Sequence, residues 1–197
     1  MIEWMFVPAA YFIGSISSAI IICRLMGLPD PREQGSGNPG ATNVMRIGGK
    51  KAAAITLLGD LLKGLIPVYS ANLLGVSVEL LAIIGLAAFL GHLYPVFFKF
   101  KGGKGVATSI GVLLGFSWLL GFAFIGTWLL IYKVGKISSL SALCASALSP
   151  VYAWFIVGDV NVVGASVVMM VILLWRHKGN IQRLLNGEEG LKAKGKD

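Results

Sequence analysis

The chain has 197 residues, of which 56% are hydrophobic and 13% are charged, and its mean hydropathy is +0.79. Soluble domains typically carry about 25% charged residues, so this composition excludes a soluble globular domain and indicates an integral membrane protein. The net charge of +8 is attributed to membrane orientation, because Lys and Arg accumulate on the cytoplasmic side, and no pattern of interleaved cations and aromatics points to nucleic acid.

Six long apolar runs follow one another in chain order, at 3–23, 52–74, 78–98, 106–131, 137–157 and 160–175. Their unbroken length favours helical spans over the short alternating strands of a barrel. The first run lacks a basic N-terminal flank, is long for a signal peptide and precedes Arg24, so we expect a retained span. Cys23 and Cys144 lie within such runs and are interpreted as small buried hydrophobes, not as disulfide or metal ligands.

Lys and Arg gather in three segments, 24–51, 99–104 and the tail from 176 onward, which we place in the cytoplasm. The connectors 72–79 and 158–161 carry no cation, so they and Glu3 are placed outside. Six spans would return the tail to the outside, so one run must hold a further crossing. The run 106–131 is interrupted at Gly115, Ser117 and Gly121, and we expect two short helices or a re-entrant hairpin there. The prediction is one all-α polytopic bundle domain, 1–197, with seven transmembrane segments, an outside N-terminus and a cytoplasmic C-terminus.

The first polar segment, about 30–48, contains GSGNPGATN at positions 35–43 and then Arg46. A G-x-G-x-x-G match without a preceding strand is weak, so a dinucleotide-binding fold is rejected. Glycines let a backbone approach a ligand closely, and Arg can bind a phosphate through two N–H groups. An ordinary capped turn is the alternative, but the convergence of polar groups beside one Arg favours an anion site.

The second segment, about 99–108, contains KGGKG at 101–105 and then Thr108. It has no Gly-Lys-Ser/Thr ending and no evident magnesium ligand, so nucleotide hydrolysis is not expected. Gly105 is predicted to open a helix whose first N–H groups face an anion held between the lysines. Lysines at a span end also contact lipid headgroups, but three glycines among three lysines favour a specific anion.

The third segment, about 176–190, is predicted to be amphipathic from Asn180 and to lie on the cytoplasmic surface. His177 and Asn180 are three residues apart and can share a helix face; for His177 we favour an active-site role over a headgroup-level one. Asp60 and Lys63 lie three apart inside an apolar run, and a functional and a structural role remain equally open. His92 is interpreted as a bundle histidine.

Together the segments 35–46, 91–108 and 177–189 resemble the three motifs of the bacterial acyl-phosphate:glycerol-3-phosphate acyltransferases (PlsY), in the same order along essentially the whole chain. The resemblance implies a multi-pass enzyme of the bacterial inner membrane with its active site facing the cytoplasm. It would transfer a fatty acyl group from acyl phosphate to the 1-hydroxyl of sn-glycerol 3-phosphate, giving lysophosphatidate and phosphate in the first acylation of phospholipid synthesis. Membrane lipids are expected as further partners; no metal, cofactor, nucleic acid or obligate protein partner is expected.

The resemblance also assigns residue roles. Ser36, Arg46, His177 and Asn180 are expected to be catalytic, and Glu189 structural. Asp60 and Lys63 are grouped with the structural residues because they can neutralise each other and fix helix packing, not because of the resemblance. The residues expected to bind substrate are Gly37, Asn38, Gly40, Thr42, Asn43, Lys101, Gly102, Gly103, Lys104, Gly105 and Thr108.

Acyl phosphate is an activated mixed anhydride, so we expect direct attack by the glycerol hydroxyl, its proton passing to His177 or to a substrate phosphate. A covalent acyl-Ser36 is the rival mechanism, although no Ser-His-acid arrangement is evident. The alternative function is a membrane transporter or channel for a phosphate ester or another anion. The chain shows no internal inverted repeat of the kind common in such carriers.

Overall fold

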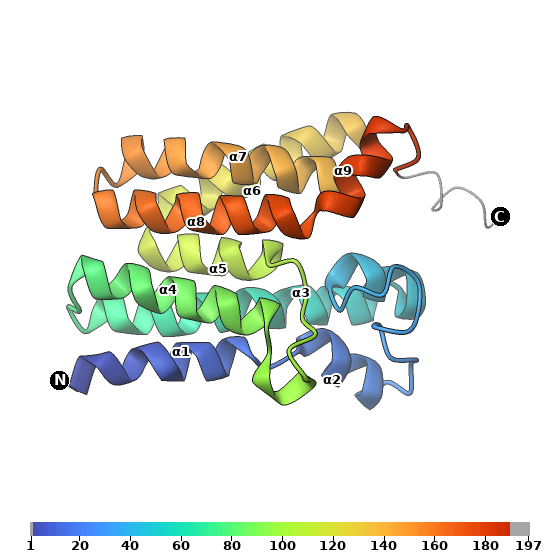
Figure 1. Cartoon of the computed structure of the whole chain (residues 1–197), viewed down its shortest axis with the longest axis horizontal. Coiled ribbons are helices and arrows are strands. Elements are labelled where there is room, and N and C mark those ends of the chain that lie inside the picture. The colour runs from blue at the N-terminus through green and yellow to red at the C-terminus, as the bar shows by residue number, and fades with distance from the viewer. Residues whose placement is uncertain (1, 190–197) are drawn as a thin grey trace.

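The structure is a computed structural model, and it describes residues 2–189. The tail cations Lys192, Lys194 and Lys196, which entered the orientation prediction, lie outside the described residues. Every regular element between residues 2 and 189 is helical, which confirms the all-α prediction (Figure 1). The elements are η1 (Ile2–Met5), α1 (Phe6–Gly14), α2 (Ser18–Leu25), α3 (Ala41–Leu73), α4 (Val78–Leu93), η2 (Val96–Phe98), α5 (Val106–Phe116), α6 (Trp118–Gly135), α7 (Ser138–Ile156), α8 (Val160–Arg176) and α9 (Lys178–Leu185).

Four of these helical segments are long and apolar enough to cross a membrane: α3, α4 with η2, α6 and α7. Two bent pairs also qualify when each is taken as one span, namely η1 and α1 with α2, bent by 42°, and α8 with α9, bent by 61°. Helix α5 is apolar but shorter. The bundle therefore has the length and composition of a multi-pass membrane protein.

The first apolar run, which we expected to be a retained span, is broken between α1 and α2, and the two parts together are long and apolar enough to form one span. Ser17 has an extended backbone with φ −86° and ψ 96°, which ends the helical ladder. The break leaves the Ile16 carbonyl free, and the Lys63 ammonium from α3 donates to it at 2.8 Å. Irregular backbone at membrane depth needs such an internal partner, so a contact from a distant helix stabilises the break.

The expected division of 106–131 into two helices is present, with Ser117 extended (φ −159°, ψ 130°) between α5 and α6. Helix α6 is longer than expected, because it continues past Ile131 to Gly135. Lys136 then adopts a left-handed conformation, φ 53°, that ends the helix.

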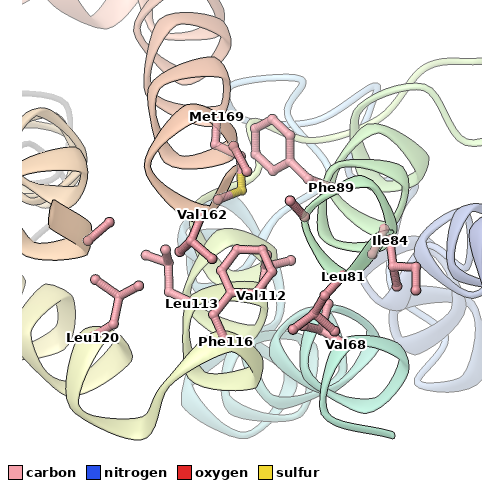
Figure 2. Close-up of a cluster of buried hydrophobic side chains, with 14 of the residues drawn as sticks. Val68, Leu81, Ile84, Phe89, Val112, Leu113, Phe116, Leu120, Val162 and Met169 are labelled. Atoms are coloured by element: carbon pink, nitrogen blue, oxygen red, sulfur yellow. The ribbon is translucent and has the colours of Figure 1, made fainter. Parts of the chain in front are cut away.

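Helix α5 packs at the centre of the bundle, against α3 on one side and α6 on the other. Gly64 and Gly111 let α3 and α5 approach closely, because a Cβ on either would collide with a carbonyl oxygen of the other helix. Figure 2 shows how side chains of α3, α4, α5, α6 and α8 meet there. The labelled core residues are Val68, Leu81, Ile84, Phe89, Val112, Leu113, Phe116, Leu120, Val162 and Met169.

The polar loops share one end of the bundle, which we call the loop end. It comprises residues 26–40, the hairpin 94–105, the start of α3 and α9 (Figure 1). The N-terminus and the connectors after α3 and α7 lie at the opposite end. The three segments singled out by their glycines, cations and His177 are therefore brought to the same side of the bundle.

Candidate functional site

The loop before α3 is held in shape by Asn43. Its amide oxygen accepts a hydrogen bond from the Ser36 backbone at 2.8 Å, and its nitrogen donates to the carbonyls of Pro31, at 2.8 Å, and Gln34, at 3.0 Å. Gly35 adopts a left-handed conformation, φ 63°, and a Cβ there would collide with the Asn43 amide. The glycine pattern of this loop thus serves a tight turn closed by a buried amide.

Gly102 and Gly103 form a buried segment that we call the glycine strap. The Gly103 N–H donates to the His92 carbonyl at 3.2 Å, and a Cβ on Gly103 would collide with His92 Nε2. The Pro39 carbonyl oxygen lies 3.1 Å from that same Cβ position, so the loop before α3 packs on the strap. Arg176 at the end of α8 donates to the carbonyls of Gly102, at 3.0 Å, and Gly103, at 2.9 Å. The strap is therefore fixed from three sides.

Lys104 follows the strap and joins it to the third segment. Its ammonium donates to the amide oxygen of Asn180, which is buried at the start of α9. The Asn180 nitrogen donates to Glu189 at 2.6 Å, and the same carboxylate accepts from Ser139 and from Arg183, each at 2.6 Å. One carboxylate thus orients the amide that positions Lys104.

The electrostatics around Lys104 favour an anion. Burial, together with the positive charges of Arg183, Arg176 and Arg46, lowers the pKa of Lys104 to about 8, against the opposing effect of Glu189. Burial would raise the pKa of Glu189, but the hydrogen bonds from Ser139, Asn180 and Arg183 outweigh it and lower that pKa. Glu189 therefore stays ionised, and a bound anion would supply the negative charge that the cations around Lys104 lack.

The N-termini of two helices, α3 and α5, also lie at the loop end. Helix α3 begins at Ala41, after the extended Gly40, and α5 begins at Val106, after the left-handed Gly105 with φ 97°. The expectation that Gly105 opens a helix is confirmed. The first backbone N–H groups of a helix have no partner within it and carry a partial positive charge, so both termini favour an anion.

The remaining predicted site residues differ in exposure. His177 is buried at the bend between α8 and α9, and its Nδ1 lies 2.9 Å from the Leu173 carbonyl, so Nδ1 donates and Nε2 of the neutral ring keeps a lone pair. Ser36 and Arg46 are exposed, the latter on the first turns of α3. Thr42 is also exposed, with its hydroxyl 3.5 Å from that of Ser138.

Thr108 takes part in helix packing. It is buried, and its hydroxyl donates to the Asp60 backbone carbonyl at 2.9 Å, which joins α5 to α3.

A buried charged group lies beneath the strap. The Lys63 ammonium and the Asp60 carboxylate are 2.8 Å apart, and His92 Nδ1 lies 3.6 Å from the same carboxylate. All three side chains are buried within the bundle. His92 also contacts the strap through its backbone carbonyl and its ring. The buried group of Asp60, Lys63 and His92 therefore connects the break between α1 and α2 to the loop that presents Lys104.

Three residues that hold this arrangement were not among the predicted site residues. Arg176 binds the strap, while Arg183 and Ser139 bind Glu189. Arg176 and Arg183 flank His177 and Asn180 in the sequence, so their proximity was a usable signal. Ser139 follows α6 and lies 50 residues from Glu189, and nothing in its local sequence marks it. Within residues 2–189, no cluster of three or more His, Cys, Asp and Glu side chains is suited to hold a metal ion.

The fold and this end of the bundle define a class: a helical integral membrane protein with a cluster of cationic side chains at one end. The model of the family described as glycerol-3-phosphate acyltransferase matches residues 4–187. The chain is 58% identical to a glycerol-3-phosphate acyltransferase of Methylococcus capsulatus, over 95% of both chains. It is also 58% identical to one of Hydrogenovibrio crunogenus, over 98% of this chain and 93% of the relative.

Two solved structures have the same fold. A crystal structure of PlsY, an integral membrane glycerol 3-phosphate acyltransferase, in its glycerol 3-phosphate form, matches with a TM-score of 0.92 at 37% identity and covers all of both chains. The lysophosphatidic acid form of PlsY matches with a TM-score of 0.88 at 38% identity, over 96% of this chain and 94% of that one. The chain therefore belongs to the glycerol-3-phosphate acyltransferase family, as its three motifs predicted.

Proposed function

We propose that this protein transfers a fatty acyl group from acyl phosphate to the 1-hydroxyl of sn-glycerol 3-phosphate. The products are 1-acylglycerol 3-phosphate, known as lysophosphatidate, and phosphate. The observation that carries the proposal is the hydrogen bond from Lys104 to Asn180, which Glu189 holds in place, beside the strap and among Arg46, Arg176 and Arg183. Support also comes from the two related structures, which are named for a glycerol 3-phosphate form and a lysophosphatidic acid form.

The cations and the free N–H groups of the loop end bind the substrate phosphates. Lys104 and Arg46 hold the two substrate phosphates, assisted by the N-termini of α3 and α5. Gly37, Gly40 and the strap provide close backbone approach, which side chains at these places would obstruct, and the Asn38 amide adds a hydrogen-bonding group. Thr42 and Lys101 lie exposed at the same end and extend the binding surface. The long acyl chain remains in contact with the lipid-facing surface of the bundle.

The chemical step is direct transfer. The hydroxyl oxygen of glycerol C1 attacks the acyl carbonyl carbon, an ester bond forms, and the bond from that carbon to the phosphate oxygen breaks. Phosphate departs with the electron pair of the broken bond. Ser36 and Asn180 donate hydrogen bonds to the developing oxyanion and to the leaving phosphate. The hydroxyl proton passes to His177 Nε2, whose lone pair is free while Nδ1 donates to Leu173, or to a substrate phosphate with a second pKa near ~6.

The remaining predicted residues position this machinery. Glu189 holds Asn180 and Arg183 by hydrogen bonds, and Asn43 closes the loop that carries Ser36. Asp60 and Lys63 take the structural role: they neutralise each other, and Lys63 caps the broken backbone at Ile16.

The membrane arrangement is a single domain with seven crossings. The seven segments are the bent pair of α1 and α2, then α3, α4, α5, α6, α7 and α8. We place the N-terminus outside and the loop end in the cytoplasm of a bacterial inner membrane, because the cations of the described chain concentrate at the loop end. The soluble acceptor and the membrane-bound donor then meet at the inner leaflet.

The decisive test is purified protein incubated with palmitoyl phosphate and glycerol 3-phosphate, with lysophosphatidate measured as product. The wild-type protein should form lysophosphatidate, and Lys104→Gln should lose most of this activity. The matched control is Lys50→Gln, at an exposed position of α3, which should keep it. Proteoliposomes that carry glycerol 3-phosphate across the bilayer without forming lysophosphatidate would instead support the transporter alternative.

Two experiments address the mechanism. Rapid quenching with labelled acyl phosphate should leave the protein unlabelled during turnover; label on Ser36 would refute direct transfer. His177→Ala should lower turnover and change its pH profile; a full rate with an unaltered profile would assign the proton to a substrate phosphate.

A further inference from the structure

A second group of cations lines a cavity at the loop end. The cavity has a volume of about 730 Å³ and lies between the end of α2, the loop before α3, the hairpin around η2 and the end of α8. Five basic side chains line it, those of Arg24, Arg32, Lys99, Lys101 and Arg176, with a single carboxylate, Glu33, among its described lining residues. Its volume falls within the roughly 300–1,000 Å³ typical of small-molecule sites.

This cavity adjoins the Lys104 site, because Gly37, Lys101 and Gly102 of the proposed substrate-binding surface also line it, whereas Arg24, Arg32 and Lys99 belong to the cavity alone. Lys104, Asn180 and His177 do not line it, whereas the backbone of Gly102 does, so the glycine strap forms part of its wall. Arg176 reaches both places: its Nη2 is bound to the strap, while its Nε is buried without a hydrogen-bond partner in the structure. A buried, unpartnered N–H of a guanidinium is costly, and the negative charge of an anion seated in the cavity would stabilise the Arg176 guanidinium through its electrostatic attraction.

The charge in the cavity is largely uncompensated. Arg32 is paired with Asp30 at 2.6 Å, but no ion pair within residues 2–189 involves Arg24, Lys99, Lys101 or Arg176. Like charges held together repel one another, and the repulsion grows where water is partly excluded. The site therefore favours an occupant with negative charge.

The surroundings of the cavity are apolar, which distinguishes it from a site for a soluble ion. Phe97, Phe98 and Phe100 line it beside the lysines, and the side chains of Phe97 and Phe100 are 59% and 58% exposed. The Phe97 ring also contacts that of Phe12 on α1, with the ring centroids 6.1 Å apart. An exposed aromatic surface thus leads from the cations to the outer face of the first span, where acyl chains of the bilayer run.

We propose that this cavity binds the phosphate of an anionic membrane glycerophospholipid, with the acyl chains of that lipid lying along the η2–α1 face. Basic pockets between spans are known to bind lipid phosphates, and cationic side chains beside aromatic ones match a headgroup next to its chains. The bound lipid neutralises the unpaired cations and supports the strap through Arg176. This inference depends on the membrane location of the chain and not on the acyl-transfer reaction.

The test measures lipid retention by the full-length protein. Protein is purified from nanodiscs of phosphatidylcholine containing phosphatidylglycerol, and retained lipids are identified by native mass spectrometry. Wild type should retain phosphatidylglycerol selectively. The double variant Arg24→Gln/Lys99→Gln should bind it about 25-fold more weakly, since each surface cation contributes roughly fivefold. Neither residue belongs to the proposed acyl-transfer site.

The matched control is Lys50→Gln/Lys51→Gln, which removes two exposed cations of α3 that do not line the cavity and should leave retention unchanged. If the first double variant fails to fold, Lys99→Gln alone should weaken retention about fivefold. Equal loss in both double variants, or equal retention of phosphatidylcholine and phosphatidylglycerol, would overturn the proposal. Displacement of the lipid by millimolar inorganic phosphate would reassign the cavity to a soluble phosphate.

Discussion

Raising the pH from 7 to 9 is expected to raise the KM for glycerol 3-phosphate about tenfold. Burial and the neighbouring arginines lower the pKa of Lys104 to about 8, from an ordinary value near 10.5. The charged ammonium binds the phosphate, so binding weakens as the proton is lost above that pKa. With only the protonated form competent, KM scales as 1 + 10^(pH − 8), which gives about 1.1-fold at pH 7 and about elevenfold at pH 9.

The measurement is initial rate against glycerol 3-phosphate concentration at half-unit steps from pH 7 to 9.5, with the acyl donor saturating. The phosphate ester has a second pKa near ~6 and does not titrate over this range. Saturating acceptor keeps Lys104 protonated, so kcat should change much less than KM. Lys104→Arg keeps its charge throughout and should flatten the KM profile. A wild-type KM that is the same at pH 7 and pH 9, or that rises equally in Lys104→Arg, would refute the assignment.

Three further predictions concern the residues that position Lys104. Gly103→Ala should lower kcat/KM at least tenfold, because its Cβ collides with His92 and moves the strap, while Gly126→Ala, where nothing lies within 4 Å, should not. Glu189→Ala should raise the KM for glycerol 3-phosphate far more than Ser139→Ala, which removes only one hydrogen bond, of about 2 kcal/mol, to the charged carboxylate; equal effects would contradict the central role of the carboxylate. Asp60→Asn should lower the free energy of unfolding in detergent by about 3 kcal/mol by leaving Lys63 buried and unpaired, and adding Lys63→Met should recover part of that loss.

The sequence predicted the helical membrane class, the division of the run 106–131, and the helix start at Gly105. Each depends on nearby residues: hydropathy sets what a segment can be buried in, and glycine sets where backbone can turn sharply. The three motifs predicted the family for the same reason, because their residue types and spacing are local properties of the chain. The pair Asp60 and Lys63 was equally visible, since residues three apart in a helix face the same side.

What depended on the tertiary structure is which distant groups meet. Lys63 caps a carbonyl 47 residues away at the break in the first span, Arg176 binds the strap 74 residues before it, and Ser139 binds Glu189 across 50 residues. No local pattern encodes such pairs, because they follow from how the helices pack and from the need of each buried polar group for a partner. For this protein, the residue types determined that the chain is a helical membrane protein and which polar groups it contains. Three-dimensional packing decided which of those groups hold Lys104 in place.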